Sequence, residues 1–321
     1  MKQIGILTSG GDAPGMNAAI RSAARTALSA GVRAVGIYRG YEGLLEGDTE
    51  ELFWKSVGGI VNRGGTILKT ARCPAFREKE NQEKAAAVLR ENGIDGLLVI
   101  GGDGSMAGAA ALESLGVRTA VVPGTIDNDM CGTEETIGYD TAVNTALAAM
   151  SRLRDTAASH NRAAVLEVMG RHAGHIALAA GLAGGAEFTL VPERPFDRKR
   201  LAEKLTAMMR EGRTNCIILC AEGAADGREL AGWLEEETGI DTRATILGYI
   251  QRGGAPSARD AVLGAVLGAA AAEGLMAGRN GFLAGVRGGR AHLVSYEEAF
   301  RSPPSFYGAG LDLALRIGAG I

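Results

Sequence analysis

Short apolar runs that end in glycine-rich polar loops, each followed by a helical pattern, recur along the chain. The run 4–8 leads into the glycine loop 9–15, and the run 96–100 leads directly into the loop 101–105, GGDGS. Strands that alternate with helices indicate βαβ units and a mostly parallel sheet. Because ligands bind at the carboxyl ends of such strands, we expect these glycine loops to line one edge of the sheet.

The same alternation begins again after the long helical pattern at 139–159. Three further strands are expected, at 163–168, 216–220 and 242–250. A chain of 321 residues is long enough to bury two cores. The predicted fold class is therefore α/β, with two Rossmann-like lobes built on mainly parallel sheets. We expect the lobes to comprise 1–138 plus about 257–303, and 139–256 plus about 304–321.

The composition is that of a globular enzyme, with 46% hydrophobic and 22% charged residues. The 48 glycines are about twice ordinary usage, which indicates tight turns or close approach to a ligand. A net charge of -3 gives no general electrostatic reason to bind nucleic acid or an anionic membrane. No apolar stretch reaches the roughly 20 residues of a membrane helix, and the amino-terminal residues lack signal-peptide features. We therefore expect a cytoplasmic protein.

The loop 123–129, PGTIDND, places one hydroxyl and two carboxylates directly after the apolar run 120–122. Alternate residues of an extended segment point to the same side, so Thr125, Asp127 and Asp129 are expected to face one pocket. A polar turn is the alternative, because Pro, Gly, Asn and Asp are the commonest turn formers. The other glycine loops at neighbouring strand ends favour a site over a turn.

Carboxylates beside glycine loops indicate chemistry on phosphates. Asp103, Asp127 and Asp129 suit Mg²⁺, which takes few carboxylates and keeps water and phosphate oxygens as its other ligands. Phosphoryl transfer needs a positioned nucleophile, a base, a metal and cations, and Asp127 is the candidate base. Guanidinium groups match phosphate oxygens, although any one arginine could instead be a solvated surface residue. The candidate phosphate ligands are Arg72, Arg162, Arg171, Arg243 and Arg252.

Four motifs, taken together, carry a resemblance to a known family. GGDGS at 101–105, PGTIDND at 123–129, MGR at 169–171 and GYIQRGG at 248–254 resemble, in order and spacing, those of bacterial ATP-dependent 6-phosphofructokinases. The resemblance runs from the first strand to about Asp260. It implies two α/β lobes with the active site in the cleft between them, and a homotetramer. It also implies the committed step of glycolysis, transfer of the ATP γ-phosphate to the 1-hydroxyl of fructose 6-phosphate.

The same resemblance assigns roles to individual residues. It implies that Asp127 takes the proton of the sugar hydroxyl with Thr125 beside it, and that Asp103 binds Mg²⁺ with help from Asp129. The residues implied to hold ATP are Gly11, Arg72, Cys73, Gly102, Asp103, Gly104 and Ser105. The residues implied to hold the sugar phosphate are Met169, Gly170, Arg171, Glu222, Tyr249 and Arg252, with Arg162 and Arg243 of the partner subunit. Gly11, Arg72 and Arg171 complete the implied catalytic set.

The phosphate donor and the catalytic competence can also be argued from the resemblance. Pyrophosphate-using relatives tend to carry Asp and Lys where Gly104 and Gly124 stand, so the two glycines favour ATP. The alternatives are a pyrophosphate-dependent enzyme, a kinase of another phosphorylated sugar, and a nucleotide-sensing subunit without turnover. The last predicts damage to the catalytic loop, whereas Asp103, Asp127 and Arg171 are all present.

The family's effector site, which binds ADP or phosphoenolpyruvate between subunits, is only partly matched. The positions that fit its pattern are Arg21, Arg25, Arg154, Gly185, Glu187 and Arg213. The residues that replace often basic or imidazole side chains are Trp54, Gly59, Glu211 and Asn215. Because loss of cations weakens an anion site, we expect an altered response to phosphoenolpyruvate.

Tyr249 stands where the family usually has a histidine that helps to bind the sugar phosphate. Tyrosine donates one neutral hydrogen bond but cannot become a cation near neutral pH. We therefore expect Tyr249→His to lower the apparent KM for fructose 6-phosphate in a coupled assay of ADP release. An unchanged or raised KM would contradict this explanation.

Overall fold

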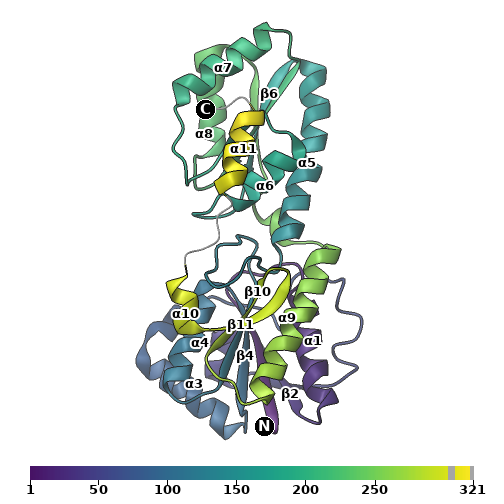
Figure 1. Cartoon of the computed structure of the whole chain (residues 1–321), viewed down its shortest axis with the longest axis vertical. Helices are drawn as coiled ribbons and strands as arrows, with labels where there is room; N and C mark the ends of the chain where they lie inside the picture. The colour runs from purple at the N-terminus through teal and green to yellow at the C-terminus, as the bar shows by residue number, and fades with distance from the viewer. Residues whose placement is uncertain (303–307, 319–321) are drawn as a thin grey trace. The chain divides into compact units, whose positions relative to one another are not determined.

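The computed structural model describes residues 1–302 and 308–318, which form two compact units (Figure 1). The first unit comprises Met1–Ile126, Met130–Asp140 and the segment that begins at Arg252. The second comprises Asp127–Asp129, Thr141–Gln251 and the carboxyl-terminal helix. The expected lobe boundary at 303 and 304 lies outside the described residues. The predicted α/β fold with two mainly parallel sheets is confirmed.

The first unit contains a seven-stranded sheet with the order β11-β10-β5-β4-β1-β2-β3. Its strands are β1 (Gln3–Ser9), β2 (Arg33–Ile37), β3 (Thr49–Leu52), β4 (Gly96–Gly101), β5 (Thr119–Pro123), β10 (Phe282–Arg287) and β11 (Arg290–Ser295). The strands from β10 to β2 are parallel, whereas β3 and β11 are antiparallel edge strands. Ser9 lies opposite Gly101, and Gly101 lies opposite Pro123. The strands β1, β4 and β5 therefore end at one level, and their loops begin side by side.

Helices cover both faces of this sheet. They are α1 (Met16–Ser29), α2 (Gly40–Glu46), the short 3₁₀ helix η1 (Pro74–Arg77), α3 (Lys79–Glu91), α4 (Asp103–Ser114), α9 (Ala258–Met276) and α10 (Tyr296–Arg301). Figure 1 shows α1 and α9 side by side, with α3 and α4 away from them. Within the described ranges, no helix is long and apolar enough to cross a membrane.

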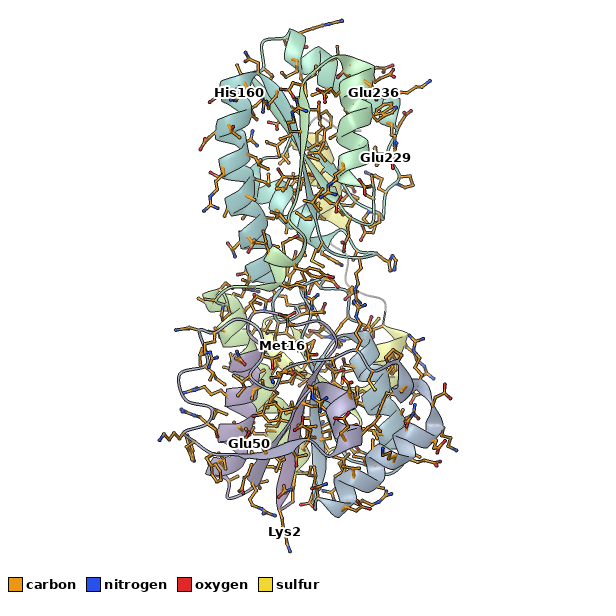
Figure 2. The ribbon with its side chains drawn as sticks, turned by 180° about the vertical axis from the view of Figure 1, so that it is seen from behind. Lys2, Met16, Glu50, His160, Glu229 and Glu236 are labelled. Atoms are coloured by element: carbon orange, nitrogen blue, oxygen red, sulfur yellow. The ribbon has the colours of Figure 1, made fainter. Side chains whose placement is uncertain are left out.

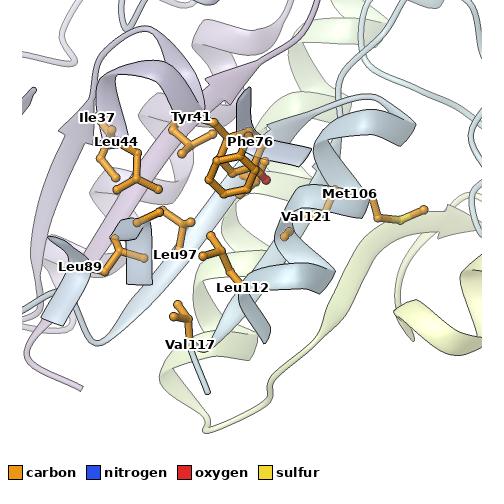
Figure 3. Packing of buried hydrophobic residues seen from close by; sticks show 14 of the residues in the cluster. Ile37, Tyr41, Leu44, Phe76, Leu89, Leu97, Met106, Leu112, Val117 and Val121 are labelled. Carbon is orange, nitrogen blue, oxygen red and sulfur yellow. The ribbon is translucent and has the colours of Figure 1, made fainter. Parts of the chain in front are cut away.

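The apolar core under α2, α3 and α4 also fixes the start of α4 (Figure 3). Leu97 of β4 and Val121 of β5 are fully buried there, as strands covered on both faces require. Tyr41 of α2 stacks on Phe76, with the ring centroids 4.1 Å apart. The Tyr41 hydroxyl donates a hydrogen bond of 2.7 Å to the Ser105 carbonyl, so the core extends directly to the GGDGS segment.

The second unit contains a four-stranded parallel sheet with the order β7-β8-β6-β9. Its strands are β6 (Arg162–Val168), β7 (Phe188–Leu190), β8 (Asn215–Ala221) and β9 (Thr242–Ile246). Its helices are α5 (Tyr139–His160, whose first two residues belong to the first unit), α6 (His175–Gly184), α7 (Arg198–Arg210), α8 (Gly227–Thr238), the 3₁₀ helix η2 (Gly248–Arg252, whose last residue belongs to the first unit) and α11 (Gly308–Ile317). Figure 2 labels Glu229 and Glu236 on α8; both are exposed, whereas Leu230 and Leu234 of the same helix face the core.

Two element boundaries and one hairpin differ from the sequence prediction. Helix α4 begins at Asp103, inside the expected loop 101–105, so most of the GGDGS segment is its first turn. The strand expected at 242–250 ends at Ile246, because Gly248 adopts a φ of 50° and opens the 3₁₀ helix η2. The β10–β11 hairpin, whose turn lies at Gly288-Gly289, was not among the predicted elements.

The contact between α1 and α9 yields a stability prediction. A Cβ atom at the buried Gly268 would lie 2.4 Å from the Ala19 carbonyl oxygen, so one helix backbone would have to move. We expect Gly268→Ala to lower the free energy of unfolding by about 1–3 kcal/mol. Gly232→Ala is the matched control, because Gly232 lies in α8 with open space around it and should gain about 0.5–1 kcal/mol.

Urea unfolding followed by tryptophan fluorescence measures both changes, because Trp54 lies in the first unit and Trp233 in the second. A Gly268→Ala variant as stable as the wild type would show that the helices do not pack as closely as described.

Candidate active site

The loops after β1, β4 and β5 are joined to one another by short hydrogen bonds. The Ser105 hydroxyl, which is buried, donates to the Ser9 carbonyl at 3.1 Å. The Gly124 N–H donates to the Gly101 carbonyl at 3.0 Å. The Thr136 hydroxyl donates to the Thr125 carbonyl at 2.6 Å. Three of the predicted ATP or catalytic segments therefore lie along one sheet edge in the first unit.

The amino terminus of α4 has the features of an anion site. Gly102 is its extended N-cap residue, and Asp103 is exposed in its first turn. A helix amino terminus favours negative charge, whether from an acidic side chain or from a bound phosphate. A Cβ atom at Gly104 would meet nothing within 4 Å, so space beside this terminus is open.

The two glycines that bear on the phosphate donor differ in their surroundings. Gly104 borders open space, so a longer side chain there would fill room that a ligand can use. A Cβ atom at Gly124 would lie 3.0 Å from Met16 Cε and 3.1 Å from Ile100 Cγ2. A side chain at position 124 would therefore require the Met16 and Ile100 side chains to shift by a few tenths of an ångström.

Arg252 is paired with a residue that the sequence analysis did not select. Its guanidinium lies 2.6 Å from Asp12 Oδ1, and a Cβ atom at Gly11 would lie 3.0 Å from the same guanidinium. The signal for Asp12 is its place as the only carboxylate in the glycine loop 9–15. Of the other predicted ATP residues, Arg72 is exposed and Cys73 packs partly against the core.

Asp127 and Arg171 form an ion pair in the second unit. The Arg171 Nε atom lies 3.5 Å from Asp127 Oδ2, and the carboxylate side chain is 7% exposed against 58% for the arginine. A buried carboxylate needs a compensating charge, which Arg171 supplies. Arg171 has a φ of 53° and Asn128 a φ of 54°, a left-handed conformation that is uncommon outside glycine and that clusters at functional sites.

The predicted sugar-phosphate residues at the carboxyl ends of β6 and β8 lie together. The N–H groups of Gly170 and Arg171 both donate to Glu222 Oε1, at 3.2 and 2.8 Å. The Met169 N–H donates to the Oε1 atom of Gln251 at 2.8 Å. Sequence reasoning missed Gln251, although it lies inside the 248–254 motif. Tyr249 in the same motif is 75% exposed.

Arg162 and Arg243 lie elsewhere in the same sheet. Arg162 is the first residue of β6, at the opposite end of the strand from Met169, and Arg243 lies near the start of the neighbouring β9. Both pair with Asp241: Arg162 at 3.0 Å and Arg243 at 2.8 Å. The structure therefore does not bring these two arginines to the other predicted sugar-phosphate residues of this unit.

Four of the predicted effector residues are gathered around Glu187. Its side chain is 7% exposed and lies 3.1 Å from Arg154 and 3.4 Å from Arg213. Arg154 also donates to the Gly185 carbonyl at 2.7 Å. Gly185, Glu187 and Arg213 border a cavity of about 480 Å³, to which Lys204 and Glu211 also contribute.

The other two predicted effector residues, Arg21 and Arg25, lie on α1 of the first unit. The Arg25 guanidinium lies 5.1 Å from the centre of the Trp54 ring, within cation–π range. It also donates to the Trp54 carbonyl at 3.3 Å. The tryptophan that replaces an often basic residue therefore packs on the neighbouring cation.

Burial controls the titration of three groups near these residues. It raises the pKa of the Cys220 thiol to about 12 and raises that of Cys216 further, with Glu187 adding to the effect at Cys216. Both thiols are therefore protonated at neutral pH. Burial lowers the pKa of His175, the first residue of α6, although Glu193 and Asp129 act in the opposite direction.

Parallel strands that end in glycine loops, an open helix amino terminus and a buried Asp127 carboxylate paired with the exposed Arg171 are features of an α/β phosphotransferase. Residues 3–275 match the family described as phosphofructokinase, and the chain belongs to this family. ATP-dependent 6-phosphofructokinase 1 of Clostridium perfringens (strain 13 / Type A) is 51% identical over 306 residues, which are 95% of this chain and 96% of the relative.

Two solved structures are similar over almost the whole chain. Pichia pastoris phosphofructokinase in the T-state matches with a TM-score of 0.88 and 36% identity, over 98% of this chain and 37% of that longer chain. The pyrophosphate-dependent phosphofructokinase from Marinobacter aquaeolei matches with a TM-score of 0.85 and 23% identity, over 95% of this chain and 86% of that chain. Because a protein named as pyrophosphate-dependent has this fold, the fold by itself does not identify the phosphate donor.

The cluster around Glu187 yields a second stability prediction. Glu187→Ala removes the partner of two arginines and the acceptor of the buried Ile217 N–H. We expect it to lower the free energy of unfolding by about 2 kcal/mol, since hydrogen bonds to charged groups contribute in this range. Glu187→Gln retains an acceptor for Ile217 and should lose less in the same urea titration. Equal losses would place the whole contribution in the carboxylate charge.

Proposed function

We propose that this chain is an ATP-dependent 6-phosphofructokinase, which transfers the γ-phosphate of ATP to the 1-hydroxyl of fructose 6-phosphate. The observation that carries the proposal is the buried Asp127 carboxylate 3.5 Å from the Arg171 guanidinium. A carboxylate beside a cation is what a hydroxyl nucleophile and a transferring phosphate need. The 51% identity with an enzyme of that name over nearly the full length supports the same reaction.

In this proposal Asp127 accepts the proton of the sugar 1-hydroxyl, with Thr125 beside it. Arg171 holds the carboxylate in place and contributes positive charge where negative charge develops. The left-handed backbone at Asn128 and Arg171 would help to orient the side chains of Asp127 and Arg171. Local backbone strain of this kind is a known feature of preorganised sites.

The proposed ATP site lies at the ends of β1 and β4. Gly11, Arg72 and Cys73 would border the nucleotide, and the first turn of α4, Gly102 to Ser105, would hold its phosphates. The open space at Gly104 supports this placement. Ser105 would contribute through its position in the turn, because its hydroxyl already bonds to Ser9.

The metal expected with ATP is Mg²⁺, and the residues present suit it. In the described part of the chain, no group of three or more His, Cys, Asp or Glu residues could hold a metal by itself. Mg²⁺ is usually held by one or two carboxylates and completes its shell with waters and phosphate oxygens. Asp103 would hold it, with Asp129 as the second carboxylate, and the bound ion would neutralise phosphate charge.

The proposed sugar-phosphate site comprises Met169, Gly170, Arg171, Glu222, Tyr249 and Arg252. Arg252 is paired with Asp12 in this structure. To bind the sugar phosphate, the Arg252 guanidinium would leave Asp12 or contact both groups at once. We further propose a homotetramer in which Arg162 and Arg243 serve the partner subunit. Arg162 begins β6 and Arg243 lies near the start of the parallel strand β9, at the opposite end of the sheet from the Met169 loop, which supports this assignment.

The effector residues around Glu187 would belong to a site for ADP or phosphoenolpyruvate. The cations there are already paired, since Arg154 and Arg213 both contact Glu187, and Glu211 adds another carboxylate to the cavity. This charge balance supports a weakened response to an anionic effector.

Direct analysis of the products, ADP and fructose 1,6-bisphosphate, tests the proposal. The protein is first assayed with ATP and fructose 6-phosphate. Pyrophosphate then replaces ATP, and other phosphorylated sugars replace fructose 6-phosphate. A last series adds phosphoenolpyruvate to the first mixture. Turnover is expected with ATP and fructose 6-phosphate. Turnover only with pyrophosphate, or only with another sugar, would establish one of the alternative kinases, and ATP binding without turnover would establish a sensing subunit.

Asp127→Ser should reduce turnover by several orders of magnitude while ATP binding, measured by calorimetry, stays nearly intact. The reason is that the change removes the proposed proton acceptor and leaves the ends of β1 and β4 untouched. Asp226→Ser is the matched control, because Asp226 caps α8 and serine also caps helices. Retained turnover in Asp127→Ser would refute the assignment of the base.

A further inference from the structure

Gln251 is a fully buried polar residue that follows two exposed ones. Its neighbours in η2, Tyr249 and Ile250, are 75% and 69% exposed, whereas Gln251 is 0% exposed. Its Oε1 atom accepts the Met169 N–H at 2.8 Å. Its Nε2 atom is buried without a hydrogen-bond partner among the described residues 1–302 and 308–318.

The amide nitrogen, which has no partner within the described residues, makes glutamine a costly choice for stability alone. A buried donor that loses its hydrogen bond to water and gains none destabilises the folded state. An apolar side chain of similar length would fill the same volume and avoid that cost. The property that only a polar side chain offers here is the acceptor oxygen that holds Met169.

The loop that Gln251 holds has an unusual backbone. Gly170 has a φ of 142° and Arg171 a φ of 53°, and a Cβ atom at Gly223 would lie 2.2 Å from the Arg171 carbonyl oxygen. Such conformations persist only where the surroundings over-determine them. Fixed acceptors for the N–H groups of the loop provide that constraint.

The acceptors come from both sides of β6. This strand lies between β8 and β9 in the sheet. Glu222, just after β8, accepts the N–H groups of Gly170 and Arg171. Gln251, in the turn after β9, accepts that of Met169. The three consecutive N–H groups of residues 169–171 are thus bound by two side chains, which come from the segments that follow β8 and β9.

We infer that Gln251 is a positioning residue for the reaction: by fixing Met169 it holds the 169–171 loop so that the Arg171 guanidinium stays against the Asp127 carboxylate. The effect of Gln251 on the reaction rests on the proposed function. Its role in holding the 169–171 loop rests on the hydrogen bonds alone. Gln251 itself need not touch either substrate.

Gln251→Met tests the inference, because methionine matches the volume and removes both the acceptor and the unpartnered donor. We expect kcat with fructose 6-phosphate to fall about tenfold, with the KM for ATP unchanged within about twofold. Gln3→Met is the matched control: Gln3 is also buried, and its Nε2 atom donates to the Asn92 carbonyl at 2.8 Å in the first unit. The control should keep its kcat.

The same change in an Arg171→Ala background separates positioning from general damage. If Gln251 acts through Arg171, Gln251→Met should lower the residual kcat less than twofold in that background. A tenfold loss in both backgrounds, or no loss in the wild-type background, would overturn the inference.

Hydrogen exchange gives a readout that does not depend on activity. The amides of Met169, Gly170 and Arg171 should exchange at least about tenfold faster in Gln251→Met than in the wild type or in Gln3→Met. Unchanged exchange would overturn the structural part. Faster exchange in a protein whose wild type does not phosphorylate fructose 6-phosphate would overturn the proposed function and leave the loop assignment standing.

Discussion

The common level at which parallel strands end is the constraint on which the site depends. In the first unit Ser9, Gly101 and Pro123 lie opposite one another in register, so the loops after β1, β4 and β5 start side by side. In the second unit Val168 lies opposite Ala221, which places the Met169 loop next to Glu222. A slip of one residue in either sheet would turn alternate side chains to the other face and separate these groups.

The loops at these ends use conformations and burials that cost stability. Asp127 is a buried carboxylate, the backbones of Arg171 and Asn128 are left-handed, and the amide nitrogen of Gln251 has no hydrogen-bond partner within the described residues. The close-packed parts of the units compensate for these costs, as in the cluster of Tyr41, Phe76 and Leu97 in Figure 3. Function and stability are thus divided between strand ends and the core.

Much of the architecture could be predicted from residue patterns. The apolar run 96–100 forms a strand of the first sheet, and the run 216–220 forms a strand of the second. Both were predicted because strands buried on both faces need a continuous apolar sequence. The predicted boundaries of α4 and β9 were wrong. Asp103 can belong to a loop or to the first turn of a helix, and the hydrogen bond from Tyr41 to the Ser105 carbonyl, which stabilises that turn, cannot be seen in the local sequence. Asp12, Gln251 and the pairing of Arg25 with Trp54 were missed, because each depends on a partner far away in the sequence.

The sequence by itself determined the alternation of strands and helices, the glycine loops and the residue types available for phosphate chemistry. These follow from local preferences and from hydrophobic periodicity, which act over a few residues. The tertiary structure alone decided which of these residues meet. It pairs Asp127 with Arg171 over 44 positions of sequence, places Arg162 and Arg243 on Asp241, and joins Met169 to Gln251. Such pairings depend on strand order and register, which no local pattern specifies.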